Sequence, residues 1–326
     1  MEAFHNKDKT VTKYLHDDGS ETCIKIVPSR YYIMKDDELI EKKKDRKKYS
    51  VIISHSSGCP IGCKMCYLTI KGYPYHPLNY HSITINVIKA IQAKVKEDPS
   101  LKQKYIKLCW MGMGDAFLDL MNVNICTTQI LDHVFRNNLA IGLDGVDIGT
   151  VFPKNSKDLH ILNQLNRALE RHWIRPFGKN VYNTDKPRSP LRIFYSLHRF
   201  DSGSRQKYLI PNSEDFYNIR QTLYNFKELC GIDVIFHQVF IEDVTDMPWL
   251  ILELKNLFGW FFKDFELRIL RYNECSESPY KESLKFDEIV KNLDKSINII
   301  KYQISPGSEI KAACGQFLMD EYRQTK

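Results

Sequence analysis

Residues 56–67 read Ser-Ser-Gly-Cys-Pro-Ile-Gly-Cys-Lys-Met-Cys-Tyr and stand two residues after an apolar run at 51–53. Three cysteines, Cys59, Cys63 and Cys66, stand in this stretch at C-x3-C-x2-C spacing. Thiolates are soft ligands that suit iron–sulfur clusters and zinc. A structural zinc site takes four ligands, usually from two C-x2-C pairs, and the chain has no second pair. The spacing therefore favours an iron–sulfur cluster over a zinc knuckle or three buried free thiols.

Three thiolates on one short loop can hold three irons of a [4Fe–4S] cluster and leave the fourth iron open. The amino and carboxylate groups of S-adenosylmethionine (SAM) can chelate an open iron. One electron from the cluster then cleaves the sulfonium and gives a 5′-deoxyadenosyl radical, so the cofactor carries the difficult chemistry. With the apolar Met65 before the third cysteine, the loop resembles the signature of the radical SAM superfamily.

Composition predicts a soluble, cytoplasmic protein. The chain has 326 residues, 43% of them hydrophobic, which is enough for one large core or a barrel. Nine cysteines, three of them clustered, are typical of a reducing compartment. The polar residues 1–8 contain no signal core, and no long apolar run follows, so no membrane partner is expected. A net charge of +7 fits a polyanionic partner and fits a lysine-rich surface equally well.

From residue 49 onward, apolar strands alternate with amphipathic helices. The predicted strands are 50–54, 105–111, 145–151, 191–197, 233–240 and 265–270. The predicted helices are 83–95, 122–137, 156–171, 213–229, 247–261 and 285–295. Six such units indicate an α/β fold, a partial (β/α)6 barrel whose chemistry lies at the carboxyl ends of its strands. The cysteine loop follows the first strand, where this rule places an active site.

We divide the chain into three parts. Residues 1–48 are expected to form a small β-hairpin over 9–27 and a charged linker over 36–48. The linker is interpreted as a solvated loop or helix face, with an RNA-facing patch as the alternative. Residues 49–304 form the barrel, with a long loop at 172–190, and residues 305–326 form a C-terminal segment. A monomer is expected.

Four further motifs follow the cysteine loop. They are Gly-Met-Gly-Asp at 112–115, Ser-Leu-His at 196–198, Arg-Tyr-Asn at 271–273 and Ala-Ala-Cys-Gly-Gln at 312–316. Together with the cysteine loop they resemble the class A radical SAM methyltransferases. That family includes the enzymes that methylate carbon 2 of an adenosine in RNA and the chloramphenicol–florfenicol resistance methyltransferases, which act on carbon 8. The resemblance runs from about residue 10 to 317, with the motifs in the same order.

The resemblance implies a role for each matching residue. Cys59, Cys63 and Cys66 would hold the cluster, Cys314 would carry the methyl group, and Glu21 would lie close to the target base. The implied SAM-binding residues are Gly114, Asp115, Thr150, Ser196, His198 and Asn273. Simpler alternatives stay open: Asp115 can cap the next helix, Ser196 and His198 can be buried hydrogen-bonding residues, and Glu21 can be a surface residue of the hairpin.

The implied mechanism needs two cysteines. One SAM would methylate the Cys314 thiolate, and a radical formed from a second SAM would let the methyl carbon add to an sp2 carbon of adenine. A second cysteine, seven residues before the first cluster cysteine in the family, would release the product by forming a disulfide with Cys314. Here that position is Ile52, which cannot form a disulfide. Cys23 and Cys109 are the candidate substitutes.

The sequence therefore predicts a radical SAM enzyme of the methyltransferase type (EC 2.1.1 class). It would transfer a SAM-derived one-carbon unit through Cys314 to an sp2 carbon of an adenine in RNA or a nucleotide, with an electron from a flavodoxin or ferredoxin. One alternative is a radical SAM enzyme that tailors a small molecule or peptide. Another is a non-catalytic iron–sulfur protein that binds SAM or RNA.

Overall fold

The computed structural model describes residues 1–26, 29–35, 38–44, 48–170, 189–201, 203–274, 277–294, 297 and 300–303. Most of the expected loop at 172–190 lies outside this part of the chain. So does the C-terminal segment 305–326 with Cys314.

One sheet of twelve strands organises the described residues, in the order β1-β2-β3-β6-β9-β10-β11-β12-β13-β14-β4-β5. Its seven central strands run parallel: β6 (Lys48–Ile53), β9 (Tyr105–Trp110), β10 (Gly142–Thr150), β11 (Leu191–Ser196), β12 (Asp233–Val239), β13 (Glu266–Leu270) and β14 (Ile300–Gln303). All six predicted strands are present, which confirms a mixed α/β fold with a central parallel sheet. The seventh, β14, was not predicted.

Antiparallel strands extend the sheet at both edges. At one edge, β1 (Glu2–His5), β2 (Val11–Leu15) and β3 (Glu21–Lys25) precede β6, and β2 with β3 is the predicted hairpin. At the other edge, β4 (Ser29–Lys35) pairs with β14 and with β5 (Glu38–Lys44). The expectation of a loop or helix face over 36–48 was wrong for β5. Pairing with β4 satisfies the backbone of this charged stretch, which outweighs its poor strand composition.

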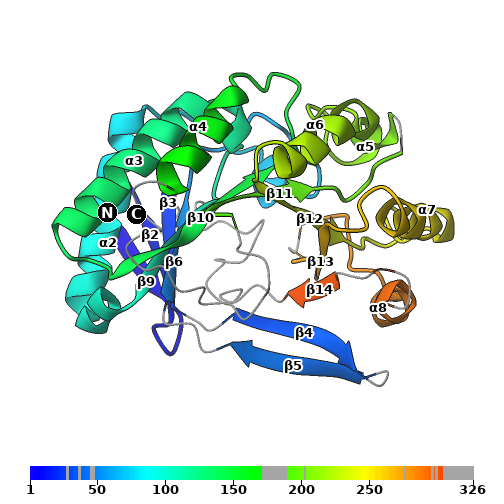
Figure 1. Cartoon of the computed structure of the whole chain (residues 1–326), viewed down its shortest axis with the longest axis horizontal. Helices are drawn as coiled ribbons and strands as arrows, with labels where there is room; N and C mark the ends of the chain where they lie inside the picture. The colour runs from blue at the N-terminus through cyan, green and yellow to red at the C-terminus, as the bar shows by residue number, and fades with distance from the viewer. Residues whose placement is uncertain are drawn as a thin grey trace.

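The helices lie on one side of the curved sheet (Figure 1). The six predicted helices appear as α2 (Tyr80–Glu97), α3 (Leu120–Arg136), α4 (His160–Leu169), α6 (Phe216–Glu228), α7 (Pro248–Gly259) and α8 (Phe286–Asp294). Two short helices, α1 (Tyr67–Ile70) and α5 (Ser204–Tyr208), follow the ends of strands, and β7 (Ser56–Ser57) pairs with β8 (His76–Pro77). No helix among the described residues is long and apolar enough to cross a membrane.

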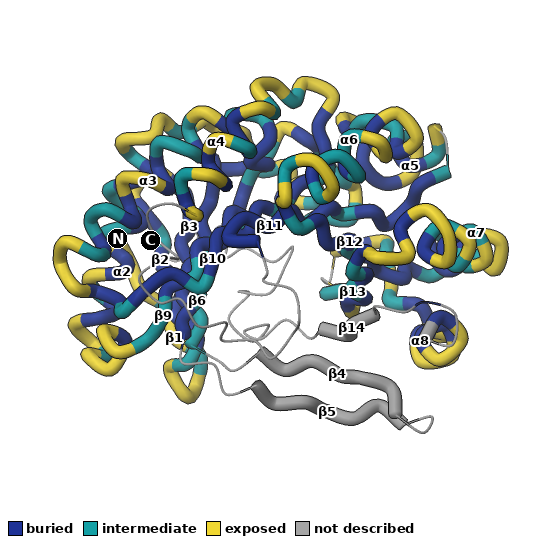
Figure 2. The backbone as a smooth tube through the Cα atoms, in the orientation of Figure 1, coloured by how far each residue is buried: buried dark blue, intermediate teal, exposed yellow. Residues whose placement is uncertain are grey.

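The hydrophobic core lies between the strands and these helices, and Figure 2 shows that the strands of this layer are buried. Side chains alternate along each strand, so Val51, Leu108 and Phe236 face the helices as part of the core. The opposite face of the sheet carries charged and polar side chains beside apolar ones. There Asp147 pairs with Lys107 at 2.6 Å and with Arg192 at 2.5 Å. Burial alone would raise the pKa of Asp147, but these two cations hold it well below its ordinary value.

Candidate active site

The candidate site lies where the parallel strands end, and Ser54 connects three parts of it. Its hydroxyl donates to the backbone oxygen of Glu21 at 2.6 Å and accepts from the backbone nitrogen of Met113 at 3.1 Å. Ser54 follows β6, Glu21 begins β3, and Met113 lies in the glycine-rich turn after β9. One side chain therefore holds the hairpin, the start of the cysteine loop and the glycine turn together.

The cysteine loop is compact because Gly58 sits against a neighbouring backbone. Gly58 has φ +73°, and a Cβ there would lie 2.2 Å from the backbone oxygen of Pro74. Farther along the loop, the backbone nitrogen of Cys66 donates to the oxygen of Cys63 at 2.9 Å, and α1 begins directly afterwards. The three thiols are thus carried by a short loop after the first parallel strand.

The thiols of Cys59 and Cys63 favour their neutral form in the absence of a bound metal ion. Burial raises the pKa of Cys59 to about 12 and that of Cys63 well above its ordinary value. Metal binding reverses this preference, because coordination deprotonates a thiol. Among the described residues, no three His, Cys, Asp or Glu side chains lie close enough together to hold a metal ion. Three cysteine thiolates are nevertheless, by their chemistry, the donor type that holds an iron–sulfur cluster.

The turn at 112–115 needs its glycines. A Cβ on Gly112 would lie 2.6 Å from Ser54 Oγ, and one on Gly114, which has φ +82°, would lie 2.3 Å from Ser56 Oγ. The backbone of this turn therefore packs directly against Ser54 and Ser56, which precede the first cysteine. This close approach explains the glycines without reference to a ligand.

Asp115, the last residue of this turn, contacts Thr150 at the end of β10. Asp115 accepts hydrogen bonds from Thr150 Oγ1 at 2.9 Å, from the nitrogen of Val151 at 2.8 Å and from the nitrogen of Phe117 at 2.9 Å. The last bond caps the short 3-10 helix Ala116–Leu118, so the capping alternative for Asp115 is what the structure shows. Burial raises the pKa of Asp115 to about 6, because these bonds offset only part of the desolvation of the carboxylate.

Ser196 and His198 stand at the end of β11. His198 adopts φ +49°, which is uncommon for a residue with a side chain, and its Nδ1 has no hydrogen-bond partner among the described residues. Gln238 holds this turn by donating to the His198 backbone oxygen at 2.7 Å. Burial lowers the pKa of His198 to about 3, so its imidazole is neutral. Asn273, half-buried, follows β13 at the same end of the sheet.

Glu21 is buried, so the alternative that it is a surface hairpin residue was wrong. It pairs with Lys13 at 2.7 Å, and both side chains are almost inaccessible to solvent. Glu21 lies one residue beyond the pairing of Thr22 with Ile53, beside the strand end that leads into the cysteine loop. The sequence analysis did not identify Lys13. The only indication of this pair in the sequence is that strand alternation places Lys13 and Glu21 on the same face of the hairpin.

Ile52 lies directly between Cys23 and Cys109. It is opposite Cys23 on β3 and opposite Cys109 on β9, so all three side chains share the sheet face away from the helices. Both thiols are buried, at 5% and 4% exposure. Two strand spacings separate Cys23 from Cys109 by about 10 Å, which is too far for a disulfide between them.

His237 is another residue that the sequence analysis missed. It lies on β12, opposite Ser196 in register, and its Nε2 has no hydrogen-bond partner among the described residues. Its ring packs against Phe194 with 4.9 Å between ring centroids. Strand alternation predicts that His237 lies on the face away from the helices, but no sequence motif includes it.

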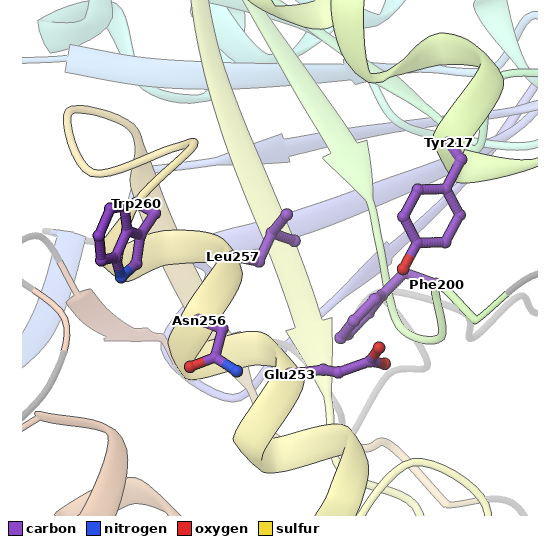
Figure 3. A pocket seen from close by; sticks show the side chains of 6 residues that line it. All are labelled: Phe200, Tyr217, Glu253, Asn256, Leu257 and Trp260. Carbon is purple, nitrogen blue, oxygen red and sulfur yellow. The ribbon is translucent and has the colours of Figure 1, made fainter.

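A hollow of about 350 Å³ lies elsewhere, in the helical layer (Figure 3). Phe200, Tyr217, Glu253, Asn256, Leu257 and Trp260 line it. Four of these residues belong to α6 and α7, and none is a predicted site residue. The hollow is therefore separate from the strand ends that carry the motifs.

Comparison with known proteins indicates the same kind of enzyme as the motifs do. No family model matches the chain. The chain is 26% identical over 275 residues to a protein of Rippkaea orientalis named "Probable dual-specificity RNA methyltransferase RlmN", covering 83% of this chain and 69% of that protein. A protein of Dictyoglomus thermophilum with the same name is 27% identical over 278 residues, with the same coverage.

Among solved structures, the fold is similar to that of a radical SAM methyltransferase from Sphaerobacter thermophilus. The TM-score is 0.63 at 18% identity, over 97% of this chain and 80% of that one. The predicted resemblance to the class A radical SAM methyltransferases is confirmed by the sequence relatives. They also confirm the prediction of an enzyme of the methyltransferase type.

Proposed function

We propose that this chain uses SAM to transfer a one-carbon unit through Cys314 to an sp2 carbon of an adenine, in RNA or a nucleotide. The carrying observation is that the cysteine loop and the motifs at 112–115, 196–198 and 271–273 all follow strands of one parallel sheet. The similarity to proteins named RNA methyltransferases, over 83% of the chain, supports RNA as the substrate class.

The strands from β6 to β13 would correspond to a partial (β/α)6 barrel with its active site at the carboxyl ends. Cys59, Cys63 and Cys66 would hold a [4Fe–4S] cluster. SAM would be bound by Gly114, Asp115, Thr150, Ser196, His198 and Asn273. When bound, these two groups supply the electron and the radical chemistry, and a flavodoxin or ferredoxin would reduce the cluster. The side chains of the protein itself would bind and orient the cluster and SAM and would exclude water from them.

Glu21 suits a role beside the base. A carboxylate can accept a hydrogen bond from an amino group on a base edge. Lys13 Nζ lies 2.7 Å from Glu21 Oε2 and holds this carboxylate in place. Burial around the pair excludes water, which strengthens such a hydrogen bond.

Release of the product would need a second thiol, and we assign it to Cys109 or Cys23, the two neighbours of Ile52. The thiolate would attack the sulfur of Cys314 in the thioether crosslink. A sulfur–sulfur bond forms, the bond between the Cys314 sulfur and the methylene carbon breaks, and its electron pair takes a proton to give the methyl product. Cys314 stands eleven residues beyond Gln303 (314 minus 303), and a chain of that length spans up to about 36–40 Å.

The test begins without substrate. The cluster is reconstituted anaerobically, SAM is added, and the mass of the peptide that contains Cys314 is determined. A methyl group on Cys314 supports the proposal. If Cys314 stays unmodified while 5′-deoxyadenosine is still formed under reductant, the chain shares only the radical step with the methyltransferases. Methyl transfer through Cys314 would then be excluded.

The second step uses SAM with a labelled methyl group and structured RNA transcripts. We expect label in adenine for the native chain and none for Cys314→Ala. Binding to RNA should weaken steeply with salt, because phosphate contacts release counterions. Label in no RNA, together with 5′-deoxyadenosine formation, would favour the alternative of a small-molecule or peptide substrate, to which the loss of the cysteine at Ile52 also points.

A further inference from the structure

The hollow in the helical layer is a site that none of the sequence motifs explains (Figure 3). Phe200 reaches it from the turn after β11, Tyr217 from the first turn of α6, and Glu253 and Leu257 from α7. Trp260 lines it just beyond the end of α7. Its volume of about 350 Å³ is within the range of small-ligand pockets, so the hollow is large enough for a small organic molecule.

Three aromatic rings give the hollow an electron-rich lining. Phe200 is buried, whereas Tyr217 is 42% exposed and Trp260 is 85% exposed. An indole that is exposed to this degree contributes little to packing within the chain, so its face is free to contact a ligand. The face of an aromatic ring carries partial negative charge and attracts cations, most strongly in tryptophan. The lining therefore favours a ligand that has both apolar surface and positive charge.

Glu253 brings a carboxylate into this aromatic lining. Its Oε2 is buried and has no hydrogen-bond partner among the described residues. Figure 3 shows the carboxylate directed toward Phe200 and Tyr217. Trp260 lies at the other end of the hollow, beyond Leu257. A carboxylate oxygen that is removed from water without a partner is costly, and a cation that donates a hydrogen bond would remove that cost. The position of this oxygen therefore points to a ligand with a positively charged donor.

The arginines near the hollow are engaged with other groups. Arg199 forms an ion pair with Asp201 at 2.8 Å. The guanidinium of Arg220 lies over the ring of Tyr217, 5.5 Å from its centroid. Among the described residues, no cation forms an ion pair with Glu253. Burial raises the pKa of Tyr217 and Glu253 adds to the rise, which agrees with a carboxylate close to this hydroxyl. The charge of Glu253 is therefore available to a ligand.

We infer that this hollow binds a small organic cation, an ammonium or guanidinium group attached to an apolar body. The cationic head would donate to Glu253 beside the rings of Phe200 and Tyr217. The apolar body would extend over Leu257 and stack on Trp260. An anion would be repelled by the Glu253 carboxylate, and a hydrocarbon would leave its Oε2 without a donor, so both fit the hollow less well. The hollow lies apart from the strand ends, and the inference therefore does not depend on the proposed function.

The test is isothermal titration calorimetry of the full chain with three probes that share one apolar body. They are 2-phenylethylammonium, the neutral 2-phenylethanol and the anion 3-phenylpropionate. The variants are Glu253→Gln, which keeps the shape of the side chain without its charge, and Trp260→Ala, which removes an indole that is 85% exposed. Glu228→Gln is the matched control, because Glu228 is an exposed glutamate of α6 that does not line the hollow.

We expect the native chain to bind the ammonium probe at least about tenfold more tightly than the alcohol, and the anion most weakly. Glu253→Gln should remove this preference and leave the affinity for the alcohol unchanged, whereas Trp260→Ala should weaken the binding of both. Glu228→Gln should bind like the native chain. Equal affinity of the native chain for the ammonium probe and the alcohol, or an unchanged preference in Glu253→Gln, would overturn the inference. So would the absence of binding with a Kd below about 1 mM.

The same titration distinguishes two sources of the cation. The amides of N-acetyl-arginine and N-acetyl-lysine represent a side chain of a protein partner, whereas 2-phenylethylammonium represents a free amine. Tighter binding of either amide would assign the hollow to a protein partner, and tighter binding of the free amine to a small molecule; both results support a cation site. Circular dichroism checks that each variant is folded. If Glu253→Gln is not, the preference of the native chain and the loss of affinity in Trp260→Ala decide the question.

Discussion

Lys13 Nζ lies 2.7 Å from Glu21 Oε2 across the N-terminal hairpin, and the two side chains are 3% and 4% exposed. A pair buried this deeply is costly to break, because removal of one partner leaves the other charge uncompensated. The hairpin therefore holds a buried, paired carboxylate at the edge of the candidate site.

We expect Lys13→Met to lower the free energy of unfolding by about 3–5 kcal/mol, and Glu21→Gln to do likewise. The double variant should lose clearly less than the sum, since it leaves no lone charge. Urea denaturation of the native chain, the two single variants and the double variant measures the interaction free energy between the two side chains. Additive losses would mean that the two groups do not interact, and the pair would then give no support to a role for Glu21.

The second prediction concerns the close contact at Gly114. A Cβ there would meet Ser56 Oγ at 2.3 Å, and φ is +82°, so Gly114→Ala should destabilise the chain by about 3 kcal/mol. Gly231 is the matched control, with φ +64° and nothing within 4 Å of the position that a Cβ would take. Its replacement by alanine should cost only the backbone strain, about 1–2 kcal/mol. Thermal denaturation compares the two, and equal losses would mean that Ser56 moves aside freely.

Much of this arrangement could be predicted from local patterns. Apolar runs predicted the strands β6 and β9 to β13, and amphipathic patterns predicted the six large helices. Because the motifs directly follow predicted strands, the sequence also predicted that Asp115, Ser196 and His198 lie at the carboxyl end of the sheet. Strand β14, only four residues long, and the lysine-rich β5 could not be predicted in this way, since pairing with distant strands stabilises β14 and pairing with β4 stabilises β5.

Residues that act through long-range contacts were also missed. Lys13 gains its importance only because β2 pairs with β3. No residue type or spacing in the chain records such a contact. The positions of Cys23 and Cys109 beside Ile52 likewise follow from the register of the sheet and not from the sequence order.

The third prediction is a pH dependence that belongs to Asp115. Its pKa in the folded chain is raised from 3.8 to about 6, so the folded state binds more protons than the unfolded state between these values. This contribution to stability is complete below pH 3.8 and is lost as the pH rises through 6. The loss amounts to about 3 kcal/mol at roughly 1.36 kcal/mol for each pKa unit.

Comparison with Asp115→Asn isolates this effect from the buried histidines. Burial lowers the pKa of His16 to about 4 and that of His198 to about 3, so their contribution changes in the opposite direction, falling as the pH falls. The difference in unfolding free energy between the native chain and Asp115→Asn should therefore shrink from about pH 4 to about pH 7. A difference that is constant across this range would show that Asp115 has an ordinary pKa.

The last prediction assigns the second thiol. If Cys109 releases the product, Cys109→Ser should stop turnover after one event and leave the RNA bound covalently to Cys314, as a slow band on a denaturing gel. Cys23→Ser would then turn over normally, and the reverse pattern would assign Cys23. Ile52 lies between the two on adjacent strands, so Ile52→Cys, at a cost of about 1 kcal/mol for the lost methyl groups, should restore turnover to the stalled variant. Normal turnover by the double variant Cys23→Ser/Cys109→Ser would exclude both thiols, and the release step would then need a different chemistry from disulfide formation on this face of the sheet.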